Sequence, residues 1–483
     1  MLLQKKININ LFYYLFTSIL LVFLFLKNDL NSFDEAKYQL LLLIIVFIIS
    51  IFTENYKENI LLKILIFHFF IFYIFRIPFS ILQDNQLFDI RYVSQIEIKN
   101  SIINLIFQYI SVYIAIFIIN PQISFNKFDK RLKNVEQNLL IINFLLWLIL
   151  SIMFLNFLFN LFGTINYENY GKYLAIIFNI FNSKRLSILF FALIFFVIIR
   201  DYKVKNLNYL IFVFITIYLI DTIFLSGSRS AILHICLLLF LLSLYYLKLK
   251  KISLKLIIIS ILFLPIILIS FFLSTVFKAL GARAIRDTFY HQDPVNFFWS
   301  MYQEIFSIMF ISSTDRIAYL NFYIEKLSNK RMYENIINLN YYFKSFVDRV
   351  TPGVDFFNVP LAAKDMQRSF SNKAFEEGLL SEPWNLRLTN SEQITIFAES
   401  QILFGHFSIL FYLLFFFILK IVCKIFKNIN IIYQQLINSF IIVLFFDWIT
   451  GFGLDFFSMN VVYSSFFLMI IIFTTVVLQK FRR

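Results

Sequence analysis

A short polar turn with one arginine lies between two long apolar runs of the sequence. The turn covers residues 226–231, and Arg229 stands in it between Ser228 and Ser230. A guanidinium group binds phosphate through paired hydrogen bonds, and a turn of small polar residues adds further donors. Because a cation at a membrane edge is costly unless it faces water, a partner or an anion, the turn predicts a binding site for phosphate or sugar oxygens. Anchoring of a span end by Arg229 is the alternative.

Five further arginines are candidates for binding the same anion. Arg76 lies near the end of an apolar run without an acidic neighbour in sequence, and a long polar region contributes Arg283, Arg286, Arg316 and Arg349. Arg316 begins a segment with helix-like apolar spacing, and Arg349 precedes a Thr-Pro-Gly turn signal. We expect these residues to bind the same anion. Solvation of the loop arginines, and a salt bridge from Arg76 to another helix, are the alternatives.

One carboxylate stands where polar sequence becomes apolar. Glu399 precedes the apolar run that begins near Ile402. Desolvation raises the pKa of such a carboxyl group, whereas a neighbouring arginine keeps it ionised, and either state suits general acid or base catalysis. Glu399 is therefore the second candidate catalytic residue beside Arg229. Structural pairing with a cation is the alternative.

The composition indicates a membrane protein. Of the 483 residues, 60% are hydrophobic and 67 are phenylalanines, which is more apolar surface than a soluble core can bury. The net charge of +14 comes from short basic clusters at alternate ends of the apolar runs, a pattern typical of membrane topology and not of nucleic-acid binding. The sequence has no phosphate-binding glycine loop, and its His and Cys residues lack metal-ligand spacing. We expect no cofactor and no metal.

Apolar runs long enough to cross about 30 Å of hydrocarbon predict an all-α, polytopic fold with about twelve transmembrane helices. The expected spans lie near residues 11–26, 38–52, 60–82, 101–119, 138–162, 186–199, 207–225, 230–247, 256–277, 402–420, 430–448 and 458–478. We expect one membrane domain, 1–483, with a large loop at 278–400 between the ninth and tenth helices.

The basic residues orient these spans. Both termini and alternate connections, such as 127–133 and 248–255, are rich in Lys and Arg. By the positive-inside rule both termini are cytoplasmic, and the Arg229 turn, the large loop and Glu399 lie on the outer face. Within the loop, residues 295–311 fit an interfacial helix, and Thr389 with Glu392 predicts a capping box that opens the tenth helix.

Four features together resemble a known family. They are about a dozen spans, the outer turn Gly227-Ser228-Arg229-Ser230-Ala231, a large late outer loop, and Ala398-Glu399 followed by Phe404-Gly405. This set is similar to the Wzy-type polymerases of O-antigen or oligosaccharide repeat units, in which arginines spread over two outer regions are typical. O-antigen ligases share the architecture but typically carry a late His-Asn pair, whereas His291 lies early in the loop and precedes Gln292.

The resemblance implies glycosyl transfer on undecaprenyl-diphosphate-linked oligosaccharides at the periplasmic face of the bacterial inner membrane, in lipopolysaccharide or related surface polysaccharide synthesis. The arginines and the two serines of the turn would bind diphosphate or glycan, and Glu399 would orient or deprotonate the acceptor hydroxyl. The reaction would need no metal. Expected partners are the lipid-linked glycans, the bilayer and a chain-length regulator protein.

Three alternatives remain open. The first is a ligase that transfers finished polymer to the lipid A core. The second is a polysaccharide flippase or transporter, although such proteins usually show paired halves and this sequence has one unrepeated loop. The third is a metal-dependent glycosyltransferase that uses Asp34 and Glu35, although the loop that carries them is short.

Overall fold

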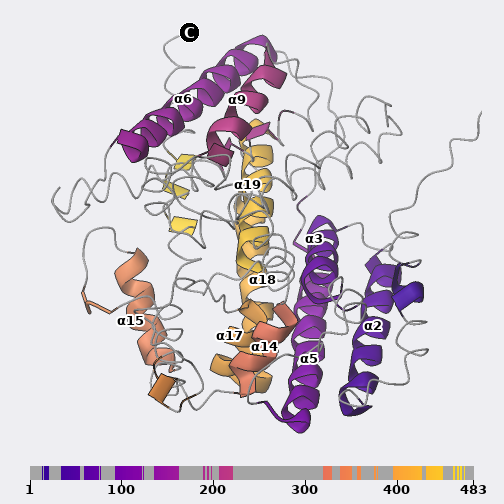
Figure 1. Cartoon of the computed structure of the whole chain (residues 1–483). Helices are drawn as coiled ribbons and strands as arrows, with labels where there is room; N and C mark the ends of the chain where they lie inside the picture. Colours follow the sequence, from indigo (N-terminus) through magenta and orange to yellow (C-terminus); the bar gives the residue numbers. More distant parts are fainter. Residues whose placement is uncertain are drawn as a thin grey trace, which may run out of the picture. The chain divides into compact units, whose positions relative to one another are not determined.

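The computed structural model describes helices that belong to an all-α fold (Figure 1). The described residues are 34–54, 59–74, 93–121, 135–162, 206–220, 319–328, 338–350, 356–359, 395–426 and 431–449, with single residues and short stretches at 14–20, 77, 123, 189–197, 372–378 and 461–473. Of these residues 92% are helical and none is in a strand. The expected helical class is therefore confirmed for the described part of the chain.

Three segments among the described residues are long and apolar enough to cross a membrane. They are Ala36–Thr53, Ile96–Ile119 and Ile396–Ile425. They correspond to the second, fourth and tenth expected spans. Shorter apolar helical segments at Ile60–Ile74, Ile142–Leu155, Tyr209–Tyr218 and Ile437–Phe446 coincide with four further expected spans. The number of twelve spans and the extent of the large loop stay predictions.

The chain divides into two compact units. Unit 1 comprises Met1–Ile123, Thr314–Asn428 and Phe445–Ser458, and unit 2 comprises Ser124–Ser313, Ile429–Leu444 and Met459–Arg483. The expected single membrane domain with its insertion at 278–400 stays a prediction, because 278–313 and most of 360–394 lie outside the described residues.

Helix α5 (Gln95–Ile119) is the central element of unit 1. It packs against α2 (Asp34–Glu54), α3 (Ile60–Phe69), α14 (Tyr319–Ser328), α17 (Ile396–Phe404) and α18 (Ser408–Phe426). In Figure 1, α5 lies between α2 on one side and the α17–α18 segment on the other. Stacked rings hold this packing: the ring centroids of Phe69 and Tyr109 are 3.9 Å apart.

Capping residues determine where α5 begins and ends. Ser94 Oγ accepts a hydrogen bond from the backbone N–H of Glu97, and the Glu97 carboxylate accepts one from the N–H of Ser94 at 2.8 Å. This capping box starts the helix six residues before the expected span at 101–119. Asn120 ends it with a left-handed φ of 46°.

The tenth expected span is built from two helices and a tight turn. A 3-10 turn, η5 (Gly405–Phe407), joins α17 to α18. A π-helical turn, η1 (Phe70–Ile74), continues α3. Gly405 has a φ of +54°, a conformation that glycine adopts without a steric penalty. Helix α19 (Ile431–Ile449) contributes Trp448 to unit 1, and the ring of Trp448 stacks on Phe415 with 4.3 Å between the centroids.

Apolar side chains form exposed stripes on the candidate spans. On α2 the stripe is Tyr38, Leu42, Ile45, Ile49 and Phe52, and on α18 it is Leu410, Leu414, Phe417, Ile421 and Ile425. The three- and four-residue spacing places each set on one face of its helix. A stripe of this length suits lipid as the solvent, because soluble proteins seldom expose so large an apolar surface.

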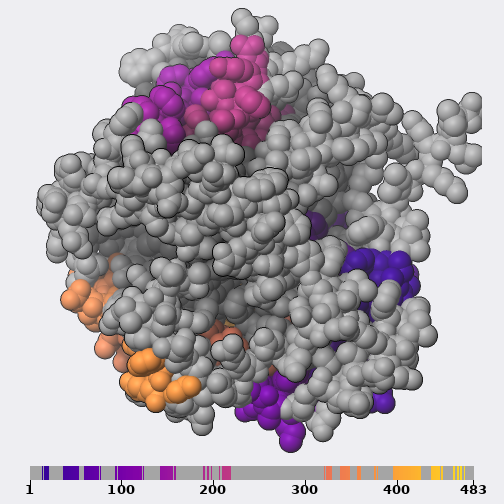
Figure 2. All heavy atoms as spheres, viewed as in Figure 1, coloured from indigo at the N-terminus to yellow at the C-terminus, as the bar shows by residue number. Residues whose placement is uncertain are grey.

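The described helices of unit 2 also pack through aromatic rings and expose apolar side chains. Helices α6 (Val135–Phe162) and α9 (Leu207–Ile220) pack on each other. Phe190 stacks on Phe214 of α9 at 3.8 Å. On the outside, apolar side chains of the two helices reach the surface, as the purple and magenta spheres in Figure 2 show. Phe144, Trp147, Phe154, Tyr209 and Phe212 are among them.

Candidate functional site

Glu399 is a buried carboxylate in the first turn of α17. Its side chain is 1% exposed. Thr395 caps the helix, because its Oγ1 accepts a hydrogen bond from the backbone N–H of Ala398 at 3.2 Å. A helix N-terminus favours negative charge through its unpaired N–H groups and its dipole. The local fold therefore places a buried acid at a helix N-terminus, within the candidate span Ile396–Ile425.

The capping residue differs from the expected one. The sequence predicts that Thr389 and Glu392 open the tenth helix, but the helix begins at Ile396 with Thr395 as its N-cap. Thr389 and Glu392 themselves lie outside the described residues. Because the helix begins at Ile396, Glu399 lies in its first turn.

A buried amide joins α5 to α17 and α18 beside this turn. Gln108 Nε2 donates hydrogen bonds to Gln401 Oε1 at 2.5 Å and to Ser408 Oγ at 2.7 Å. Gln108 Oε1 accepts one from the Tyr412 hydroxyl at 2.9 Å. Gln108 therefore links one residue of α17 and two residues of α18 across the turn that separates these helices. We call Gln108, Glu399, Ser400, Gln401, Ser408 and Tyr412 the polar cluster.

Glu399 and Ser400 belong to this cluster through Tyr412. The Tyr412 hydroxyl interacts electrostatically with the Glu399 carboxylate and lies close to Ser400 Oγ. Ser400 is fully buried, so its hydroxyl belongs to the interior of the cluster.

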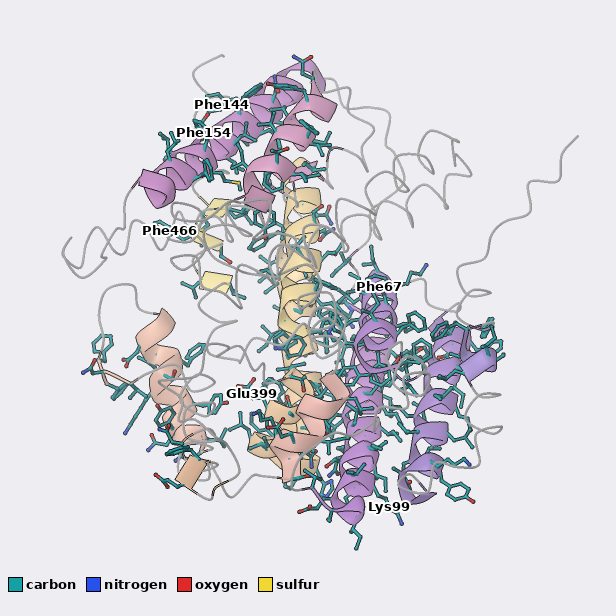
Figure 3. The ribbon with its side chains drawn as sticks, viewed as in Figure 1. Phe67, Lys99, Phe144, Phe154, Glu399 and Phe466 are labelled. Atoms are coloured by element: carbon teal, nitrogen blue, oxygen red, sulfur yellow. The ribbon has the colours of Figure 1, made fainter. Side chains whose placement is uncertain are left out.

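Helix α14 packs on two of the helices that carry the cluster. It packs against α5, α17 and η1, and Figure 3 shows Glu399 where α17 lies beside α14. Tyr323 of α14 is fully buried. Burial raises the pKa of Tyr323 well above its ordinary value, and the neighbouring Tyr412 and Tyr73 raise it further. Tyr323 therefore stays protonated at neutral pH, as a neutral O–H donor.

The same helix contributes a buried cation. Lys326 follows Tyr323 by three residues, so both lie on the same side of α14. Its side chain is 1% exposed, and Nζ is 3.9 Å from the carboxylate of Glu325. Burying an ammonium group is costly unless anionic or polar groups surround it. Lys326 is thus a buried basic residue on α14, the helix that packs on α5 and α17.

Removal of Gln108 is expected to destabilise unit 1. The Gln108→Leu variant keeps the side-chain size but leaves polar atoms of Gln401, Ser408 and Tyr412 without their partner. We expect a loss of about 1–3 kcal/mol in the free energy of unfolding. The measurement is chemical unfolding of the purified protein in detergent. Asn100→Leu, at an exposed position on the same helix, is the matched control, and equal stability of the two variants would contradict the account.

Most of the predicted site residues lie outside the part of the chain that the structure describes. They are Arg76, Ser228, Arg229, Ser230, Arg283, Arg286 and Arg316. Arg349 lies in the last turn of α15 (Leu339–Val350), whose backbone is described. Asp34 and Glu35 are the first two residues of α2. Of the predicted set, Glu399 is the residue whose side chain is placed, and its catalytic role stays a prediction.

The sequence interpretation missed Gln108, Tyr323, Lys326 and Tyr412. Gln108 had a usable signal, because an amide in the middle of an apolar run is costly in hydrocarbon and marks a function or a polar contact. Lys326 had none, since a lysine in an amphipathic loop segment is normally solvated. Among the described residues, no three His, Cys, Asp or Glu side chains lie close enough to share a metal ion.

No family model, no curated protein and no solved structure matches this chain.

Proposed function

We propose that this chain polymerises lipid-linked oligosaccharide repeat units at the outer face of a bacterial inner membrane. The observation that carries the proposal is the environment of Glu399, a buried carboxylate at the beginning of a candidate span, within a polar cluster and beneath the loop helix α14. A substrate with a lipid tail and a polar glycan needs reactive groups at such a boundary. The proposal includes the expected topology, which has about twelve spans, cytoplasmic termini and a periplasmic loop at 278–400.

The proposed reaction is transfer of the growing glycan to the next repeat unit. A hydroxyl oxygen of the incoming unit forms a bond to the anomeric carbon of the growing chain. The bond from that carbon to the diphosphate oxygen breaks, and undecaprenyl diphosphate leaves with the electron pair. The hydroxyl proton passes to the Glu399 carboxylate, which acts as general base. The donor is already activated, so the reaction needs no nucleotide.

Arginines stabilise the leaving group in this proposal. Negative charge grows on the diphosphate as the glycosidic bond breaks, and fixed guanidinium groups bind it through paired hydrogen bonds. Arg229 is the principal group, with Ser228 and Ser230 as hydroxyl donors beside it. Arg76 and the loop residues Arg283, Arg286, Arg316 and Arg349 complete the binding of diphosphate and glycan.

Lys326 adds a cation to this set. We expect Lys326→Met to lower the rate of polymer formation at least tenfold. Lys326 is a buried basic residue of α14, which packs on the helix that carries Glu399, and one lost charge contact costs about 1.5–3 kcal/mol. Lys326→Arg should recover part of the rate. Lys99→Met, which removes a partly exposed lysine from the beginning of α5 (Figure 3), is the matched control. Equal rates for Lys326→Met and Lys99→Met at equal protein amounts would contradict the role.

Reconstitution tests the activity. The purified full-length protein in proteoliposomes is supplied with the undecaprenyl-diphosphate-linked repeat unit of its own strain, without nucleotides. The proposal predicts a ladder of products that differ by one repeat unit, with equal yield when a chelator is added. If the substrate stays a single unit, the proposed activity is wrong. Loss of the ladder with the chelator would favour the metal-dependent alternative at Asp34 and Glu35.

A further inference from the structure

Helix α15 has one buried and one exposed face. Asn338 caps its start, since Asn338 Oδ1 accepts a hydrogen bond from the N–H of Tyr341 at 2.7 Å. The buried face carries Tyr342, Ser345 and Asp348. The other face presents Leu339, Phe343 and Phe346 to the outside, and Phe343 is 61% exposed. The spacing of four and three residues makes these three side chains a continuous apolar stripe.

A carboxylate holds a second aromatic segment against this helix. Asp348 Oδ1 accepts a hydrogen bond from the backbone N–H of Phe357, and Oδ2 accepts one from that of Val359, both at 2.9 Å. The two bonds fix residues 356–359 beside α15, and they use both oxygens of the acid. Phe356 and Phe357 in this segment are exposed. We call Leu339, Phe343, Phe346, Phe356 and Phe357 the aromatic patch.

A cation stands at the edge of the aromatic patch. Lys344 Nζ lies 5.8 Å from the ring centroid of Phe357, within the range of a cation–π contact. The acid of the same helix, Asp348, is buried and uses both carboxylate oxygens in backbone hydrogen bonds. The exposed side of α15 therefore combines apolar rings with positive charge, and the salmon spheres on the left of Figure 2 show that α15 reaches the surface.

These properties fit a lipid surface. A helix of 12 residues is about 18 Å long and too short to cross about 30 Å of hydrocarbon. An amphipathic helix of this kind lies in the membrane plane, with its apolar face at the boundary of headgroups and acyl chains. Aromatic rings favour that depth, and a lysine beside them extends to lipid phosphates. Helix α15 also belongs to the same compact unit as the three candidate spans.

We propose that the aromatic patch of α15 and residues 356–359 lies in the headgroup region of the bilayer that the spans cross, with Lys344 on an anionic lipid phosphate. The Asp348 hydrogen bonds present the five apolar side chains as one rigid surface. Contact with lipid then holds this part of the long polar region down on the membrane. The inference does not depend on the proposed glycosyl transfer.

Collision accessibility of a spin label tests the depth of the patch. The two cysteines, Cys236 and Cys423, are replaced by alanine in the full-length chain, and a nitroxide is attached at Phe343→Cys. The protein is reconstituted in phosphatidylcholine vesicles with a minority of phosphatidylglycerol. Accessibility is measured to oxygen, which concentrates in the bilayer, and to a water-soluble nickel chelate. Glu376→Cys, an exposed position of the same unit, is the control for water.

The proposal predicts a ratio of oxygen to nickel accessibility that is several-fold higher at position 343 than at 376. A Leu339→Cys label should give the same result, and it replaces the first variant if Phe343→Cys does not fold. Equal ratios at 343 and 376 would overturn the proposal, because they would place the patch in water. Protection of the label from both reagents would also overturn it, because protein and not lipid would then cover the patch.

Discussion

Arg229→Ala is expected to lower polymer formation about 100-fold to 1,000-fold while the amount of protein in the membrane stays normal. The reason is the loss of a fixed, bidentate donor to the diphosphate, and removal of one preorganised donor to developing negative charge costs about 2.7–4 kcal/mol. The measurement is the glycan ladder from cells that carry the variant, normalised to the protein level. Arg200→Ala, on the predicted cytoplasmic side, is the matched control.

The Arg229→Lys variant separates binding from anchoring. A lysine keeps the positive charge but lacks the planar fork that binds two phosphate oxygens. The proposed role predicts partial recovery of polymer. Full recovery with lysine, or normal polymer length and amount in Arg229→Ala, would show that Arg229 only anchors the end of a span.

Glu399→Gln is also expected to lower the catalytic rate strongly, because the variant loses the proposed general base. The amide has nearly the same volume as the carboxylate and keeps the packing in the first turn of α17, but it cannot accept the proton of the acceptor hydroxyl. General base catalysis contributes about 100-fold to 10,000-fold. We therefore expect kcat in the reconstituted reaction to fall within that range, with a much smaller change in KM.

A structural role for Glu399 makes a different prediction. The carboxylate is buried beside Tyr412 and Ser400, so a residue that only holds the fold should lower the unfolding temperature when it is changed, with little change of kcat per folded molecule. Glu376→Gln is the control, because it removes an exposed acid from the same unit. A normal kcat in Glu399→Gln would refute the catalytic role.

Hydropathy predicted the described spans, and local capping explains their boundaries. The expected spans at 38–52 and 138–162 lie within α2 and α6, because an apolar run of this length has few other stable arrangements in lipid. The starts of α5 and α17 were missed by several residues. Those starts depend on the side chains of Ser94 and Thr395, and hydropathy does not show which Ser or Thr caps a helix.

The polar cluster could be predicted only in part. Glu399 stands at a change from polar to apolar sequence, and that position alone made it a candidate. Its neighbours are long-range: Gln108 meets Ser408 across 300 residues of chain. The burial of Lys326 depends on how α14 packs on α5 and α17, and periodicity does not say which surface an amphipathic loop helix meets.

The glycan profile of a deletion strain tests the central claim most directly. If the chain is a repeat-unit polymerase, the deletion strain displays single repeat units on its acceptor, and a plasmid copy restores the ladder. A strain that displays no repeat units and accumulates carrier-linked polymer would contradict the claim in favour of a ligase. Unpolymerised repeat units confined to the cytoplasmic face would contradict it in favour of a flippase, and an unchanged ladder would contradict it outright.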